Sequence, residues 1–260
     1  MGIVNVTPDS FHDGGCHISP AKAAAHALRL AAEGAAILDI GGESTRPGSR
    51  PVTTREELRR VIPVIEKIRQ KDSRTAVSID TMKAEVARRA LEAGADIVND
   101  VSALEGDTGM AAICAAAGCP VVLMHRRGTS QEMYKLARYR NVSREVASEL
   151  AKRVRYAVKD GIRRDRILVD PGIGFAKKAP DSWKLLLNLS PLSKLGLPIL
   201  CGWSRKSFLR ELAGDLPDAR LAATLALIGP VMGQGVSVLR VHDVAATRAV
   251  LNVLQAVENP

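Results

Sequence analysis

The chain repeats one local pattern, a short apolar run followed by a helical stretch, from its beginning to its end. Residues 76–100 contain a complete unit: an apolar run ends on Asp80, an amphipathic stretch continues to Gly94, and a second apolar run ends on Asn99 and Asp100. Strand, helix and strand in this order form a βαβ unit. Eight apolar runs of this kind occur, at residues 2–6, 36–40, 76–79, 97–98, 120–124, 167–169, 198–201 and 236–239.

Eight strands that each precede a helix, with no linker between them, predict a single α/β domain over residues 1–260. The fold expected is the parallel, eight-stranded (β/α)8 TIM barrel, with its active site at the carboxyl-terminal mouth. Aromatic residues form only 3% of the chain, so Ala, Val, Leu and Ile must fill the core, as in buried parallel sheets. A doubly wound sheet also alternates strands and helices, but no GxGxxG follows the first strand, which favours the barrel.

Local signals predict where several helices begin, end or bend. Ser19 followed by Pro20 is typical of a helix start, with Ser19 as the N-cap. Gly94 stands where a helix would end in the left-handed conformation. Pro63 lies within a helical pattern and predicts a kink. The helical stretches cover residues 20–33, 56–70, 82–93, 109–117, a long stretch from 143, 182–189, 208–212, 219–232 and 245–257.

Composition restricts the partners and the compartment. The net charge of +9 is compatible with nucleic acid, but the basic residues are scattered among acidic ones and no nucleic-acid-binding motif is present, so an anionic small substrate explains the charge at least as well. No signal peptide and no bilayer-length apolar run occurs, so we expect a cytoplasmic protein without a membrane partner. The cysteines form no CxxC and should be free thiols: Cys16, Cys114, Cys119 and Cys201.

Every predicted strand ends on a polar side chain. These strand-end residues are Asn5, Asp39, Asp80, Asn99, His125, Asp170, Ser204 with Lys206, and Arg240 with His242. A single polar residue at a strand end is often a cap or a turn former. We assign Asp39 to such a role, in which it holds a neighbouring loop. Eight in succession instead predict a ligand, because the strand ends of a barrel converge and buried polar groups need partners.

The strand-end residues divide into two chemical groups. Asp80, Asn99 and Asp170, with Lys206 nearby, offer the acceptors and donors that read a flat heterocycle with amino, ring N–H and carbonyl groups. A second group suits a phosphate, because it offers donors or a metal contact, and an Arg–phosphate pair is strong and directional; it comprises Asn5, Arg240 and His242. The sequence therefore predicts a heterocycle pocket beside an anion pocket.

Eight motifs at these strand ends together resemble the dihydropteroate synthases: GIVNVTPDSFHDGG, DIGGESTRPGS, VSIDT, IVNDV, LMH, DPGIGF, GWSRKS and RVHD. This family has a (β/α)8 fold and joins 6-hydroxymethyl-7,8-dihydropterin pyrophosphate to p-aminobenzoate, with release of pyrophosphate, in folate synthesis. It is the target of sulfonamides, which mimic p-aminobenzoate. The resemblance implies a transferase that uses Mg²⁺ and a homodimer packed through its late barrel helices.

Carried over by motif, the resemblance implies a role for each site residue. The residues implied to hold or cover the pterin are Asp80, Asn99, Val101, Met124, Asp170, Phe175 and Lys206, although Phe175 can equally be a loop-packing residue. Arg240 and His242 would bind pyrophosphate, which Asn5 would help through a magnesium ion. The p-aminobenzoate site would comprise Phe11, Thr45, Arg46, Pro47, Ser204 and Lys206. Catalysis would depend on charge stabilisation at the leaving group and the ring by Asp170, Lys206, Arg240 and His242.

Some features extend or depart from this pattern. The loops at residues 7–15 and 42–51 are long for connections of this kind and predict lids over the substrates, with Asp9 and Asp13 as candidate contacts. Trp203 is larger than expected and would either crowd the p-aminobenzoate site or anchor the core. Arg126 and Arg127 would form a solvated loop or a rim that attracts phosphate. The chain begins inside the family's first strand, as a short or trimmed form would.

Two other functions are compatible with part of the sequence. A pterin-binding methyltransferase, which passes a methyl group from a reduced folate to a corrinoid, would share the Asp and Asn contacts but would not need STRPG, SRKS and RVHD together. A non-catalytic pterin-binding protein would not need Lys206, Arg240 and His242, all of which are present.

Overall fold

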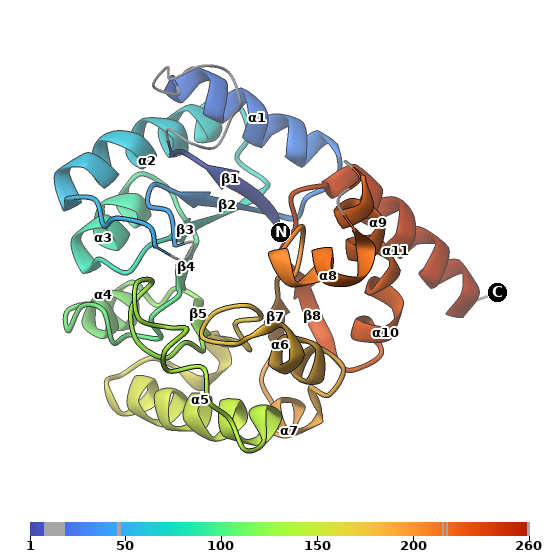
Figure 1. Ribbon diagram of the computed structural model, residues 1–260. Helices are drawn as coiled ribbons and strands as arrows, with labels where there is room; N and C mark the ends of the chain where they lie inside the picture. The colour runs from blue at the N-terminus through green and yellow to red at the C-terminus, as the bar shows by residue number, and fades with distance from the viewer. Residues whose placement is uncertain (8–18, 46–47, 215, 217, 259–260) are drawn as a thin grey trace.

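The computed structural model describes residues 1–7, 19–45, 48–214, 216 and 218–258. Eight parallel strands pair in chain order to form one curled sheet, with helices around its outside (Figure 1). The strands are β1 (Gly2–Asn5), β2 (Ile37–Gly41), β3 (Ala76–Asp80), β4 (Ile97–Asp100), β5 (Val121–Met124), β6 (Ile167–Asp170), β7 (Ile199–Cys201) and β8 (Val236–Leu239). The eight predicted strands are therefore confirmed.

The sheet closes between its last and first strands. A parallel bridge joins Gly2 to Val241, and Ile3 donates its N–H to Val241 O at 3.0 Å. Val241 in turn donates to Met1 O at 2.9 Å, and the terminal amine donates to Leu239 O at 2.8 Å. The (β/α)8 arrangement predicted from the alternation of strands and helices is therefore confirmed.

The helices follow the predicted order. They are α1 (Pro20–Ala32), α2 (Thr54–Arg69), α3 (Ala84–Glu92), α4 (Met110–Ala117), α5 (Val142–Lys159), α6 (Ala179–Leu186), α7 (Ser190–Ser193), α8 (Arg210–Ala213), α9 (Ala219–Ala226), α10 (Ile228–Met232) and α11 (Val244–Glu258), with 3₁₀ turns at Arg164–Arg166 and Ser207–Leu209. The helix predicted over 219–232 is divided at Leu227, because Pro230 has no N–H with which to continue the ladder from Ala226.

Helix ends form as the local signals predicted. Ser19 caps α1 by accepting the Lys22 N–H at 3.2 Å. Gly94 has φ +107°, and the N–H groups of Gly94 and Ala95 bond back to Leu91 O at 3.0 Å and Ala90 O at 2.8 Å. This left-handed end turns the chain directly from α3 into β4. α2 runs unbroken from Thr54 to Arg69 through Pro63.

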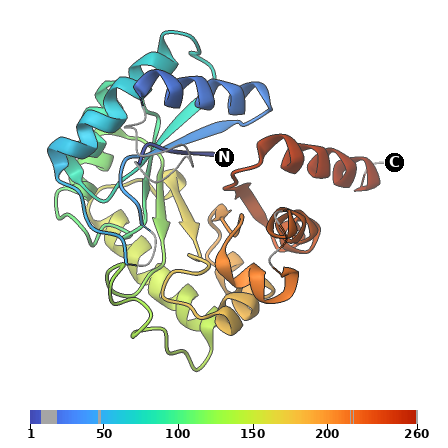
Figure 2. The same ribbon diagram turned by 45° about the horizontal axis from the view of Figure 1, so that its top comes forward.

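The core lies between the sheet and the ring of helices. Val61, Ile65 and Ile68 of α2 are fully buried, as are Leu38 and Ile40 of β2. Each such side chain contributes roughly 1.5–3 kcal/mol through burial. α11 extends away from the barrel (Figure 2), and within the described ranges no helix has the length and apolar character needed to cross a bilayer.

Candidate active site

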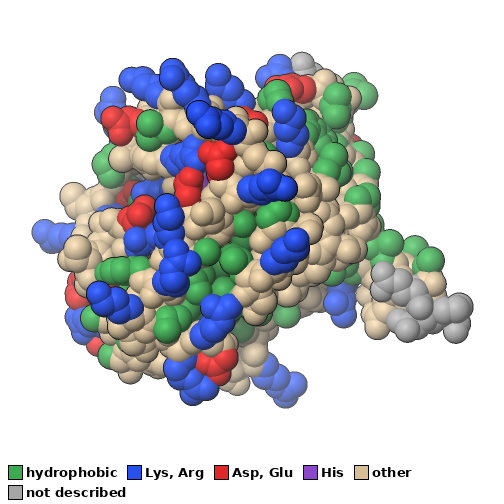
Figure 3. Space-filling view, turned by 90° about the horizontal axis from the view of Figure 1, so that it is seen from below, with side chains coloured by type: hydrophobic (Ala, Val, Ile, Leu, Met, Phe, Trp, Pro, Cys, Tyr) green, Lys and Arg blue, Asp and Glu red, His purple; other side chains and the backbone are tan. Residues whose placement is uncertain are grey.

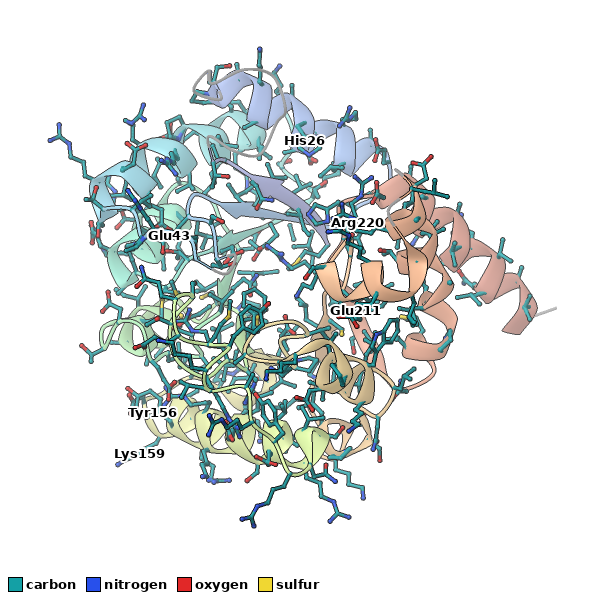
Figure 4. All side chains as sticks on the ribbon, in the orientation of Figure 1. His26, Glu43, Tyr156, Lys159, Glu211 and Arg220 are labelled. Carbon is teal, nitrogen blue, oxygen red and sulfur yellow. The ribbon has the colours of Figure 1, made fainter. Side chains whose placement is uncertain are left out.

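Four strand-end residues from different strands form one buried network at the barrel mouth. The side chain of Asp39 connects two members of this network. Its Oδ2 accepts from Arg240 Nε at 2.6 Å and from Asn99 Nδ2 at 3.1 Å. Arg240 also donates through Nη2 to Asp80 Oδ2 at 2.8 Å. Side chains converge in this way on the centre of the barrel, whereas Tyr156 and Lys159 lie at its periphery (Figure 4).

The assignment of Asp39 to a neighbouring loop is wrong. Its side chain is fully buried and serves Asn99 and Arg240, two residues that the sequence analysis had placed in separate pockets. The predicted heterocycle and anion pockets are therefore joined through Asp39, and also through the pair formed by Arg240 and Asp80.

Two carboxylates share one guanidinium in this network. Burial raises the pKa of Asp80 to about 8, the guanidinium of Arg240 opposes that rise, and the Asp39 carboxylate adds to it. The site therefore holds Asp80 near the point where it exchanges a proton. A carboxyl group in that condition can accept from, or donate to, a polar heterocycle.

Asp170 and Lys206 form the second half of the mouth. Asp170 Oδ1 accepts the Gly172 N–H at 2.7 Å, and burial raises the pKa of this carboxyl while the charge of Lys206 lowers it. Burial lowers the pKa of Lys206 to about 8, against the attraction of Asp170. The Lys206 ammonium donates to Ile173 O and lies 4.6 Å from the centre of the Phe175 ring. Phe175 is thereby stacked beside a cation at the mouth.

Ser204 and His242 also lie together. Ser204 Oγ is 3.0 Å from His242 Nδ1 and accepts the His242 N–H at 3.2 Å. Ser204 is buried, at 4% exposure, so its hydroxyl is oriented mainly by the histidine. Two residues that were predicted to serve different substrates are thus direct neighbours.

Two apolar residues predicted to pack on the ligand are buried at strand ends. Val101 follows β4, and Met124 ends β5 in register with Asp170 of β6. Neither belongs to the main hydrophobic cluster between the sheet and the helices. They are therefore apolar surfaces in the interior of the barrel, on the side of the polar network.

Other predicted site residues are placed only in part. Phe11, Arg46 and Pro47 lie outside the described residues, as do Asp9 and Asp13. Thr45 and Asn5 are half-buried, the latter at the end of β1. Within the described ranges, no three His, Cys, Asp or Glu side chains are grouped in a way that could hold a metal ion.

Contacts in the structure define the roles of three strand-end or loop residues, and Trp203 takes the core-anchor role, one of the two predicted for it. His125 lies behind the mouth, 2.9 Å from both Glu149 and Lys177, and so does not face the polar network. Trp203 is an anchor in the core, where it is 2% exposed and donates to Thr224 O at 3.0 Å. Arg127 is half-buried and binds Glu149 and Glu145 of α5.

Two lysines with specific buried partners, the buried Lys177 and the half-buried Lys83, were missed by sequence reasoning. Lys177 is 1% exposed, and Lys83 bonds both Glu43 and the buried Glu57, the latter at 2.5 Å. Both follow strand-end motifs by several residues, in stretches whose polar composition is typical of exposed loops and helix starts. The local sequence pattern signals neither the burial of Lys177 nor the bond of Lys83 to the buried Glu57.

The chain matches known proteins over nearly its whole length. The family described as pterin binding enzyme matches residues 1–242. The dihydropteroate synthase of Escherichia coli (strain K12) is 41% identical over 256 residues, which cover 98% of this chain and 90% of that protein.

Solved structures agree with this match. The Xanthomonas albilineans dihydropteroate synthase with 4-aminobenzoic acid superposes with a TM-score of 0.92 at 48% identity, covering 100% of this chain and 92% of that one. The same enzyme has also been solved with 7,8-dihydropteroate, with a TM-score of 0.89 at 46% identity, covering 100% and 93%. A Yersinia pestis dihydropteroate synthase with a sulfonamide drug complex superposes with a TM-score of 0.93 at 38% identity, covering 100% and 94%.

Proposed function

The chain belongs to the dihydropteroate synthases of the pterin-binding enzyme family, and from this premise we propose how its barrel mouth carries out the reaction. The reaction breaks the bond between the pterin methylene and the pyrophosphate oxygen. It forms a bond from that methylene to the amino nitrogen of p-aminobenzoate, which releases a proton. The products are 7,8-dihydropteroate and pyrophosphate.

One observation carries the placement of the pterin. Asp80, Asn99 and Asp170 lie at the ends of three strands that converge on one mouth, all three are buried, and the charge of Lys206 acts on Asp170. Carboxylates and an amide in a buried site need donors and acceptors from a ligand with matching groups. We assign the ring N–H and amino groups of the pterin to the carboxylates, and the ring carbonyl to Lys206.

Pyrophosphate departure needs charge stabilisation at the leaving group rather than an activated nucleophile, because the aniline nitrogen is already nucleophilic. We assign this role to Arg240 and His242. The bonds of Arg240 to Asp39 and Asp80 use two of its five N–H donors, so others are available to a diphosphate. Asp170, held by Gly172, complements the electron-poor ring that forms as the leaving group departs.

The residues fit a magnesium ion that is held mainly by the substrate. Mg²⁺ prefers oxygen ligands and commonly binds through one protein side chain, water and phosphate oxygens. Asn5 supplies an amide oxygen at the carboxyl end of β1, the strand that pairs at Gly2 with Val241, the residue after Arg240. When bound, the ion would neutralise charge on the diphosphate.

The p-aminobenzoate site is proposed around Phe11, Thr45, Arg46, Pro47, Ser204 and Lys206. Its support is the position of Thr45 and Ser204 beside the same mouth. Ser204 is also bonded to His242, so we separate its two possible roles by experiment.

The activity is tested with purified protein, the dihydropterin pyrophosphate, p-aminobenzoate and Mg²⁺, by measurement of dihydropteroate and pyrophosphate. Equal amounts of both products support the synthase. Pterin binding without product would instead support a non-catalytic protein. Asn99→Ala should raise KM for the dihydropterin pyrophosphate by about tenfold, as expected for the loss of one buried hydrogen-bonding group.

Ser204→Ala distinguishes the two roles of that hydroxyl. A higher KM for p-aminobenzoate alone supports direct contact with that substrate. A higher KM for the dihydropterin pyrophosphate alone shows that Ser204 acts through His242. Ser148→Ala, at an exposed position on α5, is the matched control and should change neither constant.

We also propose that the chain is a cytoplasmic homodimer that associates through its late helices. Val253 and Val257 of α11 are 62% and 73% exposed, and Leu212 of α8 is 76% exposed. Large apolar side chains exposed on late helices, which α9 connects by contacts with both α8 and α11, support an interface on this side of the protein. Lys and Arg side chains are spread among acidic ones over the face seen in Figure 3, as expected for a protein with small anionic substrates. Val253→Asp should shift the mass measured by light scattering from dimer to monomer.

A further inference from the structure

The segment that follows Asp170 has an unusual backbone. Residues 171–178 contain neither helix nor strand, and three alternate residues adopt positive φ: Gly172 at +64°, Gly174 at +80° and Ala176 at +50°. Ala176 is not a glycine, so the left-handed conformation at this position must be imposed by its surroundings. A segment without ladder hydrogen bonds is held in place by whatever binds its carbonyl groups.

Side-chain donors meet four of those carbonyl groups. Lys177 Nζ lies 3.1 Å from Gly172 O and 2.8 Å from Phe175 O. Lys206 donates to Ile173 O. The hydroxyl of Tyr139 donates to Ala176 O at 3.0 Å. Two of these four bonds come from Lys177, which directly follows the segment 172–176, and the other two come from Lys206 and Tyr139 elsewhere in the barrel.

The third partner of Lys177 is a histidine. Its Nζ is 2.9 Å from His125 Nδ1, while His125 Nε2 lies 2.9 Å from Glu149. Burial and the charge of Lys177 lower the pKa of His125 to about 4, so the ring is neutral at pH 7. Nδ1 then accepts from Lys177, and Nε2–H donates to Glu149. The backbone oxygen of His125 also lies 3.4 Å from Lys177 Nζ, so four acceptors surround a group with at most three N–H donors. Burial lowers the pKa of this lysine well below its usual value.

These contacts form a closed circuit that starts and ends on the same segment. Glu149 accepts from Arg127 Nε at 3.1 Å, and the Arg127 guanidinium lies 4.0 Å from the centre of the Tyr139 ring. Tyr139 in turn donates to Ala176 O. The residues of this circuit are distinct from those of the network around Asp39, Asp80, Asn99 and Arg240.

We propose that Lys177 is a positioning residue that holds segment 172–176 in the conformation that forms the pterin site. The segment connects to the site at two points. Gly172 N–H fixes the carboxylate of Asp170, and Phe175 carries the ring that lies against Lys206. The inference rests on the pterin site proposed above, and Lys177 itself has no contact with substrate in it. A methionine would match the length and apolar stem of Lys177 but would remove its bonds to Phe175 O, His125 Nδ1 and Gly172 O, of which Gly172 O would still accept the Phe175 N–H at 2.9 Å.

The test compares Lys177→Met with Lys178→Met, the same change at the next residue, which is exposed at the start of α6. The affinity for 6-hydroxymethylpterin, a probe without phosphate, is measured by quenching of its fluorescence. We expect Lys177→Met to weaken binding by about tenfold or more, and Lys178→Met to leave it unchanged. Lys177→Met should also raise KM for the dihydropterin pyrophosphate more than KM for p-aminobenzoate. Binding equal to the parent's would overturn the proposal.

A double-mutant cycle separates positioning from general stability. If Lys177 acts through the segment, Lys177→Met combined with Phe175→Ala should cost less affinity than the two changes added together. Strict additivity would contradict the proposal. Tyr139→Phe removes only the hydroxyl bonded to Ala176 and should weaken pterin binding by about two- to fivefold. If Lys177→Met does not fold, Tyr139→Phe decides: weaker binding supports the proposal and unchanged binding overturns it.

The binding assay also keeps this inference distinct from the proposed function. If the parent protein binds 6-hydroxymethylpterin but forms no dihydropteroate, the catalytic proposal fails. Loss of that binding in Lys177→Met would still support the positioning role.

Discussion

Replacement of Asp39 by asparagine tests whether one buried carboxylate orients both halves of the site. The change keeps the volume of the side chain, so it opens no cavity. It removes the negative charge beside Arg240 and exchanges one acceptor for an NH₂ donor that faces the amide of Asn99. The expected result is a less stable protein in which Asn99 and Arg240 are no longer fixed.

The magnitude follows from the contacts. The 2.6 Å bond from Arg240 Nε would have a neutral amide oxygen in place of a charged acceptor, which costs about 1–1.5 kcal/mol. The NH₂ group would stand in place of Oδ1, which lies 3.4 Å from Asn99 Nδ2, and this mismatch adds about 1 kcal/mol. Relief of the repulsion between Asp39 and Asp80, and burial of one charge fewer, offsets part of this loss. We expect the free energy of unfolding to fall by about 2 kcal/mol.

Thermal unfolding followed by circular dichroism measures this change. A loss of about 2 kcal/mol should lower Tm by roughly 4–8 °C in a chain of this size. Burial, the main cause of the raised pKa of Asp80, remains, but this pKa should fall in part because the Asp39 charge that adds to it is gone, and NMR of a carboxyl-labelled sample measures the shift. The affinity for 6-hydroxymethylpterin should weaken because Asn99 is free to turn.

Asp165→Asn is the matched control. It also removes a carboxylate that binds an arginine, Arg163, but both side chains of that pair are more than 60% exposed. A surface pair of this kind should leave Tm unchanged. If Asp39→Asn unfolds at the same temperature as this control and binds pterin as the parent does, Asp39 does not orient the site and the reasoning is wrong.

Three further predictions follow from the same contacts. Burial lowers the pKa of Lys206 to about 8, so the folded protein binds fewer protons than the unfolded chain between about pH 8 and 10.5, and the cost of burying this charge is relieved as the pH rises through that window. Pterin affinity should decline over the same window as the ammonium loses its proton, and Lys206→Arg should remove the decline. If the pH profile of binding is the same in Lys206→Arg as in the parent, the role of Lys206 in pterin binding is refuted. Gly172→Ala should lower the free energy of unfolding by more than about 3 kcal/mol, since its Cβ would lie 2.1 Å from His125 O, and calorimetry showing parental stability would contradict this. Lys83→Met leaves Glu57 without its cation and should lower the free energy of unfolding in urea by about 2 kcal/mol. The loss is smaller than for a fully buried pair because Lys83 is half-buried. A urea midpoint equal to the parent's would show that the pair contributes little.

The barrel was predictable because its signals are local. Each strand is marked by a short apolar run, and helix ends are marked by residues such as Ser19 and Gly94, whose backbone preferences act within one turn. Convergence of strand ends is a property of the fold, so the eight-fold repeat was enough to bring Asp80, Asn99 and Asp170 to one mouth. The division of α9 from α10 was missed, although Pro230 carried the signal for it.

The sequence by itself determined the barrel, the family and the set of polar residues at the mouth, because these depend on periodic patterning and on motifs within a few residues. Only the tertiary structure decided which side chains pair. Asp39 and Arg240 are 201 residues apart, and Lys177 and His125 are 52 apart. The pattern around each residue carries no record of its distant partner. Burial of a charge depends on what the folded chain places around it, so the roles of Asp39 and Lys177 became apparent only in three dimensions.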